Sequence, residues 1–392
     1  MIESIASPVP ASQARRFRDY KVIAKQAESH VITSFVLAPT DGMPLLPYKP
    51  GQYLVFRFSI DGQTVLRNYS VSGDPDQLGQ LRISVKHETA PAGTEVPDGL
   101  GSSYLHYQVQ VGDVLQAAGP LGDFYLDESS ARPVVLLSGG VGLTPMLSML
   151  HRLVNQSERK VHFMHACENG DVHAFGAEVM ELVARRPNVQ ALFWYRAALA
   201  HDASRTWSFT EGLLTKEQLQ RYLPLDDYDF YLCGPSGFMQ ANYALLRQLG
   251  VVAERIHYEF FGPATVLEQT VADIDAVAQT ASVLTAAAEP QPVLAPAPAT
   301  ATVSTDSTTL TFLPDGRQAQ WQDDYESLLV AAEDAGLQPN FNCRSGICNS
   351  CMCTLVEGEV EYFEEPLDEV PVGKVLICCA KPKGAVVIEM ES

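Results

Sequence analysis

The chain has 392 residues, 46% of them hydrophobic, and a formal net charge of −20 at pH 7. This length and composition predict a globular protein of two or three domains and exclude a disordered chain. The acidic balance argues against nucleic acid and anionic membranes as partners, and no apolar run is long enough to span a bilayer.

Residues 1–14 are polar and rich in small side chains, and we expect a disordered tail. The tail has no apolar core and few basic residues, so it is neither a signal peptide nor a transit peptide, and we expect a cytoplasmic protein. From residue 15 to residue 130, short alternating strands are separated by turns, as in residues 53–60 before Asp61-Gly62. This pattern predicts a small antiparallel β-barrel.

Three short motifs lie in the barrel: an R-x-Y-S strand end, a second strand end, and the expected start of a helix capped by Ser102 or Ser103. Their members are Arg67, Tyr69 and Ser70, then Lys86 and Glu88, then Gly101, Ser102 and Ser103. In this order they resemble the FAD-binding barrel of the ferredoxin reductase superfamily, which implies that all eight residues bind FAD. The resemblance places Arg67 on the flavin pyrophosphate, Tyr69 on the ring face and Ser70 near the reactive N5 atom. A helix start built from small residues would also offer the pyrophosphate N–H donors.

A continuous apolar strand at residues 133–138 opens a second domain, 131–263. It is followed by Gly140 and Gly142, which allow a close backbone approach, and by Thr144-Pro145, which predicts an N-cap with proline at the first helical position. These residues do not form G-x-G-x-x-G. They resemble the superfamily's G-x-G-x-T-P, which implies that they bind the pyrophosphate of a nicotinamide dinucleotide.

The rest of the second domain alternates strands with helices. We expect strands at residues 161–166, 191–195 and 229–233, and helices near residues 177–186 and 237–249. This alternation predicts an α/β doubly wound sheet.

Cys233, Gly234 and Pro235 follow the last of these strands. A cysteine at a strand end is usually ordinary packing, but ligands in open α/β sheets bind beyond the carboxyl ends of strands. The three residues match the superfamily's C-G-P, which implies a place beside the nicotinamide.

The domain closes with Glu259, Phe260 and Phe261. By the same resemblance, Glu259 lies near the flavin ring and Phe260 or Phe261 covers the face where nicotinamide docks. The resemblance therefore makes Ser70, Cys233 and Glu259 the candidate catalytic residues that flank the hydride path.

A more specific likeness concerns residues 165–175, 194–196 and 230–240, which resemble the reductase half of flavohaemoglobins. That likeness covers residues 15–263. Only a short tail precedes the barrel, so we expect no haem-bearing globin and no nitric oxide dioxygenation by this chain alone. Those reductases favour NADH. Arg196 and Arg205 are the candidates for reading the extra phosphate of NADPH, so we predict NADH and keep NADPH as the alternative.

Residues 264–305 are rich in Ala, Pro, Thr and Val and predict a linker between domains. The third domain, 306–392, has 5 basic and 16 acidic residues, a balance of −11. It opens with a strand at residues 310–313, a turn at residues 314–316 and a helix from about residue 324 to residue 335.

In this third domain, four residues separate Cys343 from Cys348 and two separate Cys348 from Cys351. This is the loop spacing by which plant-type ferredoxins hold a [2Fe-2S] cluster, whereas zinc and disulfide frameworks fit it poorly. The domain resembles a β-grasp ferredoxin of α+β class. The resemblance makes Cys378 the fourth ligand, in a segment like V-L-x-C-x-A-x-P. Cys353 and Cys379 are then buried packing residues.

The three expected cofactors imply an order of electron flow. Nicotinamide gives two electrons as hydride, the cluster takes one at a time, and FAD does both, so we expect NADH to FAD to [2Fe-2S] to a partner protein. The leading hypothesis for the partner is a Rieske-type oxygenase. A hybrid-cluster or other nitrogen-oxide protein is the rival acceptor, and a redox-responsive signalling module is the alternative class.

Acidic residues between the cluster loop and Cys378 predict where the partner docks. They are Glu357, Glu359, Glu361, Glu364, Glu365, Asp368 and Glu369. Such a face can simply keep a domain in solution, but its place beside the cluster favours electrostatic steering of the electron-acceptor protein.

Overall fold

The structure, a computed structural model, describes residues 11–90, 93, 96–261, 308–341 and 343–390. The predicted linker lies outside these residues.

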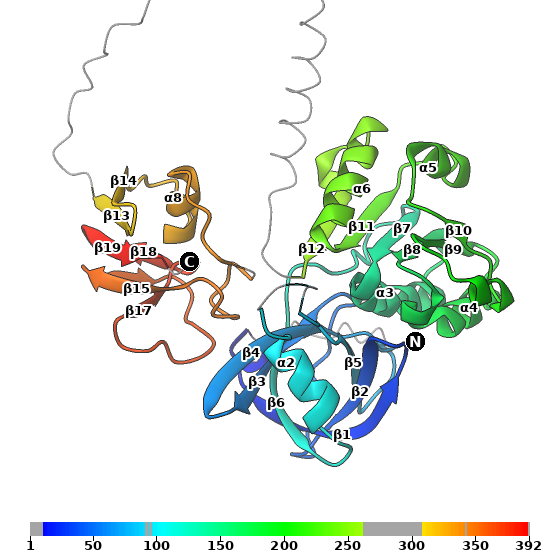
Figure 1. Cartoon of the computed structure of the whole chain (residues 1–392), viewed down its shortest axis with the longest axis horizontal. Coiled ribbons are helices and arrows are strands. Elements are labelled where there is room, and N and C mark those ends of the chain that lie inside the picture. Colours follow the sequence, from blue (N-terminus) through cyan, green and yellow to red (C-terminus); the bar gives the residue numbers. More distant parts are fainter. Residues whose placement is uncertain (1–10, 91–92, 94–95, 262–307, 342, 391–392) are drawn as a thin grey trace, which may run out of the picture. The chain divides into compact units, whose positions relative to one another are not determined.

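The chain divides into two compact units, residues 1–261 and residues 262–392, which are described separately. The first holds an antiparallel barrel and a parallel sheet, and the described part of the second holds a mixed sheet and the helix α8 (Leu328–Asp334) (Figure 1). This confirms the predicted fold class of β-barrel, doubly wound α/β sheet and α+β domain.

The barrel has six strands in the order β4-β3-β6-β1-β2-β5, with antiparallel neighbours. The strands are β1 (Arg18–Ala27), β2 (Ile32–Pro39), β3 (Tyr53–Ile60), β4 (Gln63–Ser70), β5 (Leu81–Lys86) and β6 (Val114–Leu121). Asp61 and Gly62 have φ of 50° and 77°, as a two-residue hairpin turn between β3 and β4 requires. Past the end of β4, Val71 bridges Ile83 of β5, which joins the two edges and closes the barrel.

Regular structure begins before the end of the predicted disordered tail. Ala11–Ala14 form one helical turn, α1, and Ala14 is buried. The tail prediction for residues 1–14 was therefore wrong at its last four residues, because α1 lies against β6. Residues 1–10 are outside the described residues.

The expected helix in the barrel starts earlier than predicted. It runs through α2 (Leu100–Ser103) into a π-helical turn, η1 (Tyr104–Gln108), and its N-cap is Gly99. The cap prediction for Ser102 or Ser103 was wrong because the end of β5 fixes the chain first: the N–H of Gly99 donates to the Glu88 carbonyl at 2.7 Å. The Ser102 hydroxyl then accepts from the Glu88 N–H at 3.1 Å and donates to the Gly99 carbonyl at 2.9 Å.

The second sheet has six parallel strands in the order β10-β9-β8-β7-β11-β12. The strands are β7 (Val134–Gly139), β8 (Val161–Cys167), β9 (Val189–Tyr195), β10 (Thr210–Glu211), β11 (Asp229–Gly234) and β12 (Ile256–Phe260). Helices α3 (Leu143–Gln156) and α4 (Gly176–Ala184) lie on one side, and α5 (Lys216–Tyr222) and α6 (Ser236–Gln248) on the other (Figure 1). Short 3-10 turns are η2 (Gly140–Gly142), η3 (Gly170–Val172), η4 (Ala200–Ser204) and η5 (Ala253–Arg255). The strand order reverses between β7 and β11.

Helix α3 also starts before its predicted cap. The turn η2 leads directly into the helix, so Gly142 is the N-cap and Thr144 is the second helical residue. The Thr144 hydroxyl donates to the Val141 carbonyl at 3.0 Å instead of accepting from the helix. The prediction of Thr144 as N-cap was wrong by two residues.

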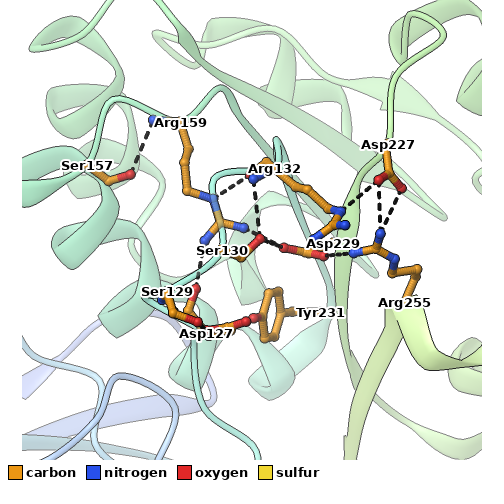
Figure 2. Close-up of polar contacts among 10 residues, drawn as sticks. All are labelled: Asp127, Ser129, Ser130, Arg132, Ser157, Arg159, Asp227, Asp229, Tyr231 and Arg255. Atoms are coloured by element: carbon orange, nitrogen blue, oxygen red, sulfur yellow. Dashed lines mark hydrogen bonds and ion pairs between the residues drawn. The ribbon is translucent and has the colours of Figure 1, made fainter.

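At the amino-terminal edge of this sheet, charged side chains form a buried network (Figure 2). Asp229, the first residue of β11, accepts from Arg159 at 2.7 Å, from Arg255 at 2.9 Å and from Ser130 at 2.5 Å. Arg159 also donates to backbone carbonyls, at Asp127 and Arg132. Because both carboxylate oxygens have partners, this network ties β8, β11 and β12 to the segment that arrives from the barrel.

The second unit has a sheet in the order β14-β13-β19-β15-β17 and a separate pair, β16 with β18. The strands are β13 (Thr309–Leu313), β14 (Arg317–Gln320), β15 (Met352–Glu357), β16 (Val360–Tyr362), β17 (Lys374–Leu376), β18 (Ala380–Pro382) and β19 (Val386–Glu389). The helix α8 covers Leu328–Asp334, so its predicted start at residue 324 was wrong. Ser327 caps it, accepting from the Val330 N–H at 3.4 Å, and the helix begins there. Among all described residues, no helix combines the length and the hydrophobicity needed to cross a bilayer.

Candidate active site and metal centre

Strand β4 and helix α2 bring the first motif together. Gly101 lies so close to β4 that a Cβ atom there would be 2.8 Å from Cγ of Arg67 and 3.5 Å from the Tyr69 hydroxyl. The ring of Tyr69 also packs against that of Phe56, with 5.7 Å between the ring centroids. Burial raises the pKa of the Tyr69 phenol, so its hydroxyl stays neutral. The arrangement is a narrow cradle between a helix start and an arginine, which fits a pyrophosphate.

Ser70 lies at the end of β4 and is buried, yet no described residue gives its hydroxyl a hydrogen-bond partner. An unsatisfied buried hydroxyl costs about 1–3 kcal/mol. A flavin ring edge, rich in hydrogen-bonding atoms, would satisfy it. The Ser70 hydroxyl and the glycine cradle together fit FAD.

The other predicted FAD residues lie around the end of β5. Lys86 and Glu88 form an exposed ion pair at 2.8 Å, and Ser103 contacts the His87 ring at 3.2 Å. Ser102 already uses its hydroxyl to hold Glu88 against the helix. These side chains therefore shape the helix start, and its backbone N–H groups are the donors left for a phosphate.

The glycine turn after β7 meets the end of β11. Gly140 has φ of 52°, and a Cβ atom at Gly142 would overlap the Cys233 carbonyl. A Cβ atom at Gly234 would lie 2.7 Å from the Phe238 ring and 3.0 Å from the Gly139 nitrogen. The backbones of both strands thus approach at the point where the strand order reverses, which is where open α/β sheets bind ligands. Pro235 follows as the N-cap of α6.

Cys233 and Glu259 are neighbours across β11 and β12. Burial raises the pKa of Glu259 to about 8, with a further contribution from the charge of Asp123, and its Oε2 atom has no hydrogen-bond partner among the described residues. Burial also raises the pKa of Cys233 well above its usual value. At neutral pH this end of the sheet therefore presents a protonated carboxyl and a neutral thiol. Phe260, which ends β12, is buried, whereas Phe261 is 41% exposed.

Within the barrel, Ser70 is linked through Tyr53 and Gly122 to a residue that acts on Glu259. It pairs with Tyr53, and a Cβ atom at Gly122 would lie 2.6 Å from the Tyr53 ring. The next residue, Asp123, acts on Glu259. Asp123 was missed by the sequence analysis, and only the Gly-Asp pair at the end of a predicted strand could have drawn attention to it.

A second group missed from the sequence joins the barrel to the nucleotide sheet. Arg82 of β5 donates to both oxygens of Glu178 of α4, at 2.7 and 2.9 Å, and His151 contacts the same carboxylate at 2.7 Å. Burial would raise the pKa of Glu178, but the hydrogen bonds from His151 and Arg82 lower it to about 2. This clasp joins strand β5 of the barrel to helices α3 and α4 of the nucleotide domain.

In the second unit, Cys343, Cys348, Cys351 and Cys378 come together around one loop. Backbone N–H groups aim at the sulfurs: Gly346 at Sγ of Cys378, and Ile347 and Cys348 at Sγ of Cys343, each at 3.3 Å. The hydrogen bond with Cys343 lowers the pKa of Cys348 to about 6, and contacts with Cys343 and Cys351 lower that of Cys378. The same contacts raise the pKa values of Cys343 and Cys351. Four clustered cysteine sulfurs with amide donors around them fit a [2Fe-2S] cluster.

Cys379 and Cys353 lie beside this loop in the apolar core. Cys379 is fully buried and its Sγ is 3.6 Å from the Leu376 carbonyl; Cys353 contacts the Met390 sulfur at 3.9 Å. A Cβ atom at Gly346 would lie 2.7 Å from the Cys379 sulfur, so the loop can pass Cys379 only with glycine there.

Three families match successive parts of the chain. They are described as an oxidoreductase FAD-binding domain over residues 19–125, an oxidoreductase NAD-binding domain over residues 136–243 and a 2Fe-2S iron-sulfur cluster binding domain over residues 310–383. With the sites described above, they define the class: the protein is an NAD(P)H-dependent flavin and iron–sulfur oxidoreductase that carries electrons from NAD(P)H through FAD to a [2Fe-2S] cluster.

Individual relatives narrow the class. The flavohaem-like FAD/NAD-binding domain of nitric oxide dioxygenase from Vibrio cholerae O1 biovar El Tor is 41% identical, with a TM-score of 0.55, over 63% of this chain and 99% of that one. The Bacillus cereus (strain ATCC 10987) flavohemoprotein is 45% identical over 64% of this chain and 62% of its own length. The chain thus spans about three fifths of the flavohemoproteins it matches. It belongs to the flavohaem-like family of FAD- and NAD-binding reductases and carries a 2Fe-2S domain in addition.

Phthalate dioxygenase reductase has the same fold over a larger share of the chain. Its TM-score is 0.52 at 21% identity, over 95% of this chain and 98% of that one. This likeness shows the fold alone.

Proposed function

We propose that this protein is the NADH-dependent reductase component of an oxygenase, with a Rieske-type hydroxylase as the terminal acceptor. The observation that carries the proposal is that one chain holds both a site for two-electron exchange and a four-cysteine site for one-electron delivery. A carrier that only oxidised NADH would not need the second. Phthalate dioxygenase reductase is described as a modular structure for electron transfer from pyridine nucleotides to [2Fe-2S]. Its fold matches nearly the whole of this chain, which supports the same assignment here.

When bound, FAD accepts electrons in pairs from nicotinamide and releases them singly. The chain's own residues bind and orient it. We assign Arg67 and the N–H groups of α2 to the pyrophosphate and the Ser70 hydroxyl to the ring edge, where its missing partner would be found. Glu259 supplies a carboxyl that is uncharged below about pH 8, and it therefore places no negative charge beside the hydride path.

At the nicotinamide end of the site, water must be kept away from the flavin face. Cys233 and the glycines around it bring the backbone within contact of the ligand, and Phe261, partly exposed at the end of β12, is assigned to cover the flavin face until the nucleotide arrives. A neutral thiol at Cys233 packs against the ring without competing as a nucleophile.

The acceptor docks, in this proposal, at the acidic segment of the second unit. This segment is fastened to the cluster loop, because the Leu367 N–H donates to the Gly346 carbonyl at 2.9 Å and the Phe363 N–H donates to the Cys379 carbonyl at 3.2 Å. Glu361, Glu365 and Glu369 on it are exposed. A partner with a basic surface around its own redox centre would be steered to the cluster.

No disulfide joins any of the eight cysteines, all of which lie within the described residues. Four of them must stay reduced to hold a cluster, which supports the proposed cytoplasmic location, since disulfides form in oxidising compartments.

A second acceptor is supported by a specific observation. The reductase unit is 41–45% identical to flavohaem proteins, one of which is named a nitric oxide dioxygenase. We therefore propose, as the alternative, that electrons reach a nitrogen-oxide-handling protein such as a hybrid-cluster protein.

One experiment tests the proposal and separates the alternatives. NADH is first added to the holoprotein without oxygen, and reduction of the flavin and the cluster is followed. An acceptor is then supplied: a Rieske oxygenase together with oxygen and its substrate, a hybrid-cluster protein with its own substrate, or cytochrome c. Reduction of both flavin and cluster, then steady turnover with the oxygenase, is the expected result. Turnover with the hybrid-cluster protein alone would favour the alternative acceptor. Reduction that stops after one equivalent, with no acceptor turning over, would overturn the enzyme assignment in favour of a redox-responsive signalling module.

A further inference from the structure

The segments after β8 and β9 lie at the carboxyl edge of the nucleotide sheet, on the side away from β11 and β12. If the pyrophosphate binds at the turn after β7 and the nicotinamide at the end of β11, the adenosine half extends over β8 and β9. The inference below rests on this proposed NADH site. It concerns the groups that would meet the adenosine ribose.

Arg205, one of the two arginines at this edge, is committed to the fold. Its Nε atom donates to Asp202 at 2.9 Å, and Asp202 is buried and also accepts from the N–H groups of Gly170 and Leu199. Arg205 lies 5.6 Å above the Trp207 ring. Burial would raise the pKa of Asp202, but these hydrogen bonds lower it to about 2, so the pair stays charged and closed. Arg205 therefore cannot turn toward a ligand phosphate without leaving a buried carboxylate unpaired.

The other arginine, Arg196, is on the surface, and its partner there is Glu168. Nε of Arg196 donates to Oε2 of Glu168 at 2.7 Å, with the two side chains 65% and 42% exposed. The backbone holds them in register, because Arg196 N–H donates to the Cys167 carbonyl at 2.9 Å and Ala197 N–H donates to the Glu168 carbonyl at 2.8 Å. Glu168 thus presents a carboxylate, paired with Arg196, at the edge where the ribose would lie.

We infer that Glu168 sets the choice between the two nicotinamide dinucleotides in favour of the one without a 2′-phosphate. Its carboxylate can accept a hydrogen bond from a free ribose 2′-hydroxyl, whereas a 2′-phosphate would face a like charge. The same carboxylate occupies Arg196, the exposed arginine at this edge that could otherwise read the phosphate. Repulsion and the capture of the arginine act in the same direction, which is how specific sites reject a close competitor.

The test compares Glu168→Gln with wild type in two assays, turnover and direct binding. For the holoenzyme, kcat/KM for NADPH and NADH is measured with ferricyanide. We expect the NADPH to NADH ratio to rise about tenfold or more, which corresponds to about 1.4 kcal/mol. Calorimetric binding of 2′,5′-ADP and of 5′-ADP, which needs no electron transfer, should shift in the same sense.

Glu158→Gln is the matched control. Glu158 is a fully exposed carboxylate that pairs with Arg186 at 3.1 Å, just before the start of β8 at the opposite edge of the same sheet. It removes the same charge, so a change in both variants would be a long-range effect and would overturn the inference. Adding Arg196→Met to Glu168→Gln should lose the part of the gain that comes from the freed arginine.

Two further outcomes decide the matter. An unchanged ratio in Glu168→Gln, or a wild type that prefers NADPH, overturns the selectivity role and leaves electron transfer intact. If NADH fails to reduce the flavin at all, the proposed function falls, while the ADP binding data still decide the role of Glu168.

Discussion

Two buried carboxyl groups at opposite edges of the nucleotide sheet differ in whether their oxygens have hydrogen-bond partners within the chain. At the amino-terminal edge, both oxygens of Asp229 are satisfied by Arg159, Arg255 and Ser130 (Figure 2). At the carboxyl-terminal edge, Oε2 of Glu259 is buried with no partner among the described residues, and the same holds for the hydroxyl of Ser70 in the barrel. Asp229 thus completes its hydrogen bonds within the chain, whereas Glu259 and Ser70 leave theirs for ligands. The second unit shows a similar contrast in two adjacent residues, since the Cys378 sulfur contacts those of Cys343 and Cys351 whereas Cys379 is packed in the core.

The largest effect should come from replacing Cys378, whose sulfur we assign to the cluster. Cys378→Ser is expected to abolish the EPR signal of the reduced two-iron cluster and the reduction of cytochrome c, because one of four ligands is lost. Ferricyanide reduction by the flavin should persist.

Cys379→Ser is the control for this change, since it alters the neighbouring sulfur in the same loop. We expect the EPR signal and both activities to stay nearly intact. The reverse result would move the fourth ligand to Cys379.

The amino-terminal edge can be broken by Asp229→Asn, which leaves the buried Arg159 without a charged partner. Removing one member of a buried ion pair costs about 3–5 kcal/mol, so the urea midpoint of unfolding should fall sharply while flavin content changes little in the folded protein. The measurement is denaturant unfolding followed by tryptophan fluorescence.

Asp227→Asn provides the comparison for that variant. Asp227 pairs with Arg132 and Arg255 in the same network but is 65% exposed, so its loss should lower the urea midpoint far less than the loss of Asp229. Equal losses from both variants would show that burial of the Asp229 pair is not what stabilises this edge.

A smaller, pH-dependent effect should mark the carboxyl-terminal edge. The folded pKa of Glu259 is raised to about 8, so the folded protein keeps a proton that the unfolded chain releases near its ordinary pKa of 4.5. The contribution of this residue is therefore complete below about pH 4.5, and it is lost as the pH rises through 8. Glu259→Gln cannot ionise, so its stability relative to wild type should increase between pH 5 and pH 8.5. Parallel stability curves for the two proteins would mean that Glu259 titrates normally.

The smallest effect concerns steering by the second unit, whose charge of −11 contrasts with −9 for the first 305 residues. Changing Glu361, Glu364 and Glu365 to Gln should slow electron delivery to a basic acceptor such as cytochrome c by roughly three- to tenfold at low salt. Raising the salt to 1 M, where the Debye length is about 3 Å, should remove the difference. Turnover of NADH with ferricyanide serves as the readout that should not move.

The matched triple variant replaces Asp315, Asp323 and Asp324 with Asn. These residues are exposed in the same unit, near β14 and before α8, and the change in charge is the same. If this variant slows delivery as much, net charge alone steers the partner and the acidic segment is not a docking site.

Much of this arrangement could be predicted from the sequence where the signal is local. The cysteine spacing from Cys343 to Cys351 predicted one loop, and the loop does bring those sulfurs together with Cys378. The apolar run before Gly140 predicted a strand and turn at the edge where they are found. Such patterns succeed because the residues that interact are close in sequence.

The failures have a common physical cause. The caps expected at Ser102 or Ser103 and at Thr144 moved because Glu88 fixes one helix start and the turn η2 leads into the other. The Glu88 contact is tertiary, and η2 is held by its close approach to Cys233 of β11, so no helix propensity reveals either start. The pairs of Asp123 with Glu259 and of Arg82 with Glu178 were invisible for the same reason, since their members are far apart in the chain and meet only in the fold.

The contact between Gly142 and Cys233 also limits how this protein can evolve. A Cβ atom at residue 142 would overlap the Cys233 carbonyl, which belongs to the backbone and so cannot be relieved by changing a side chain. Even alanine, the smallest side chain that could replace this glycine, would force β11 and the turn apart. A lineage that keeps β11 in contact with this turn must therefore keep glycine at position 142. Residues on the adenosine side of the sheet, such as Glu168, can change nucleotide preference without this constraint.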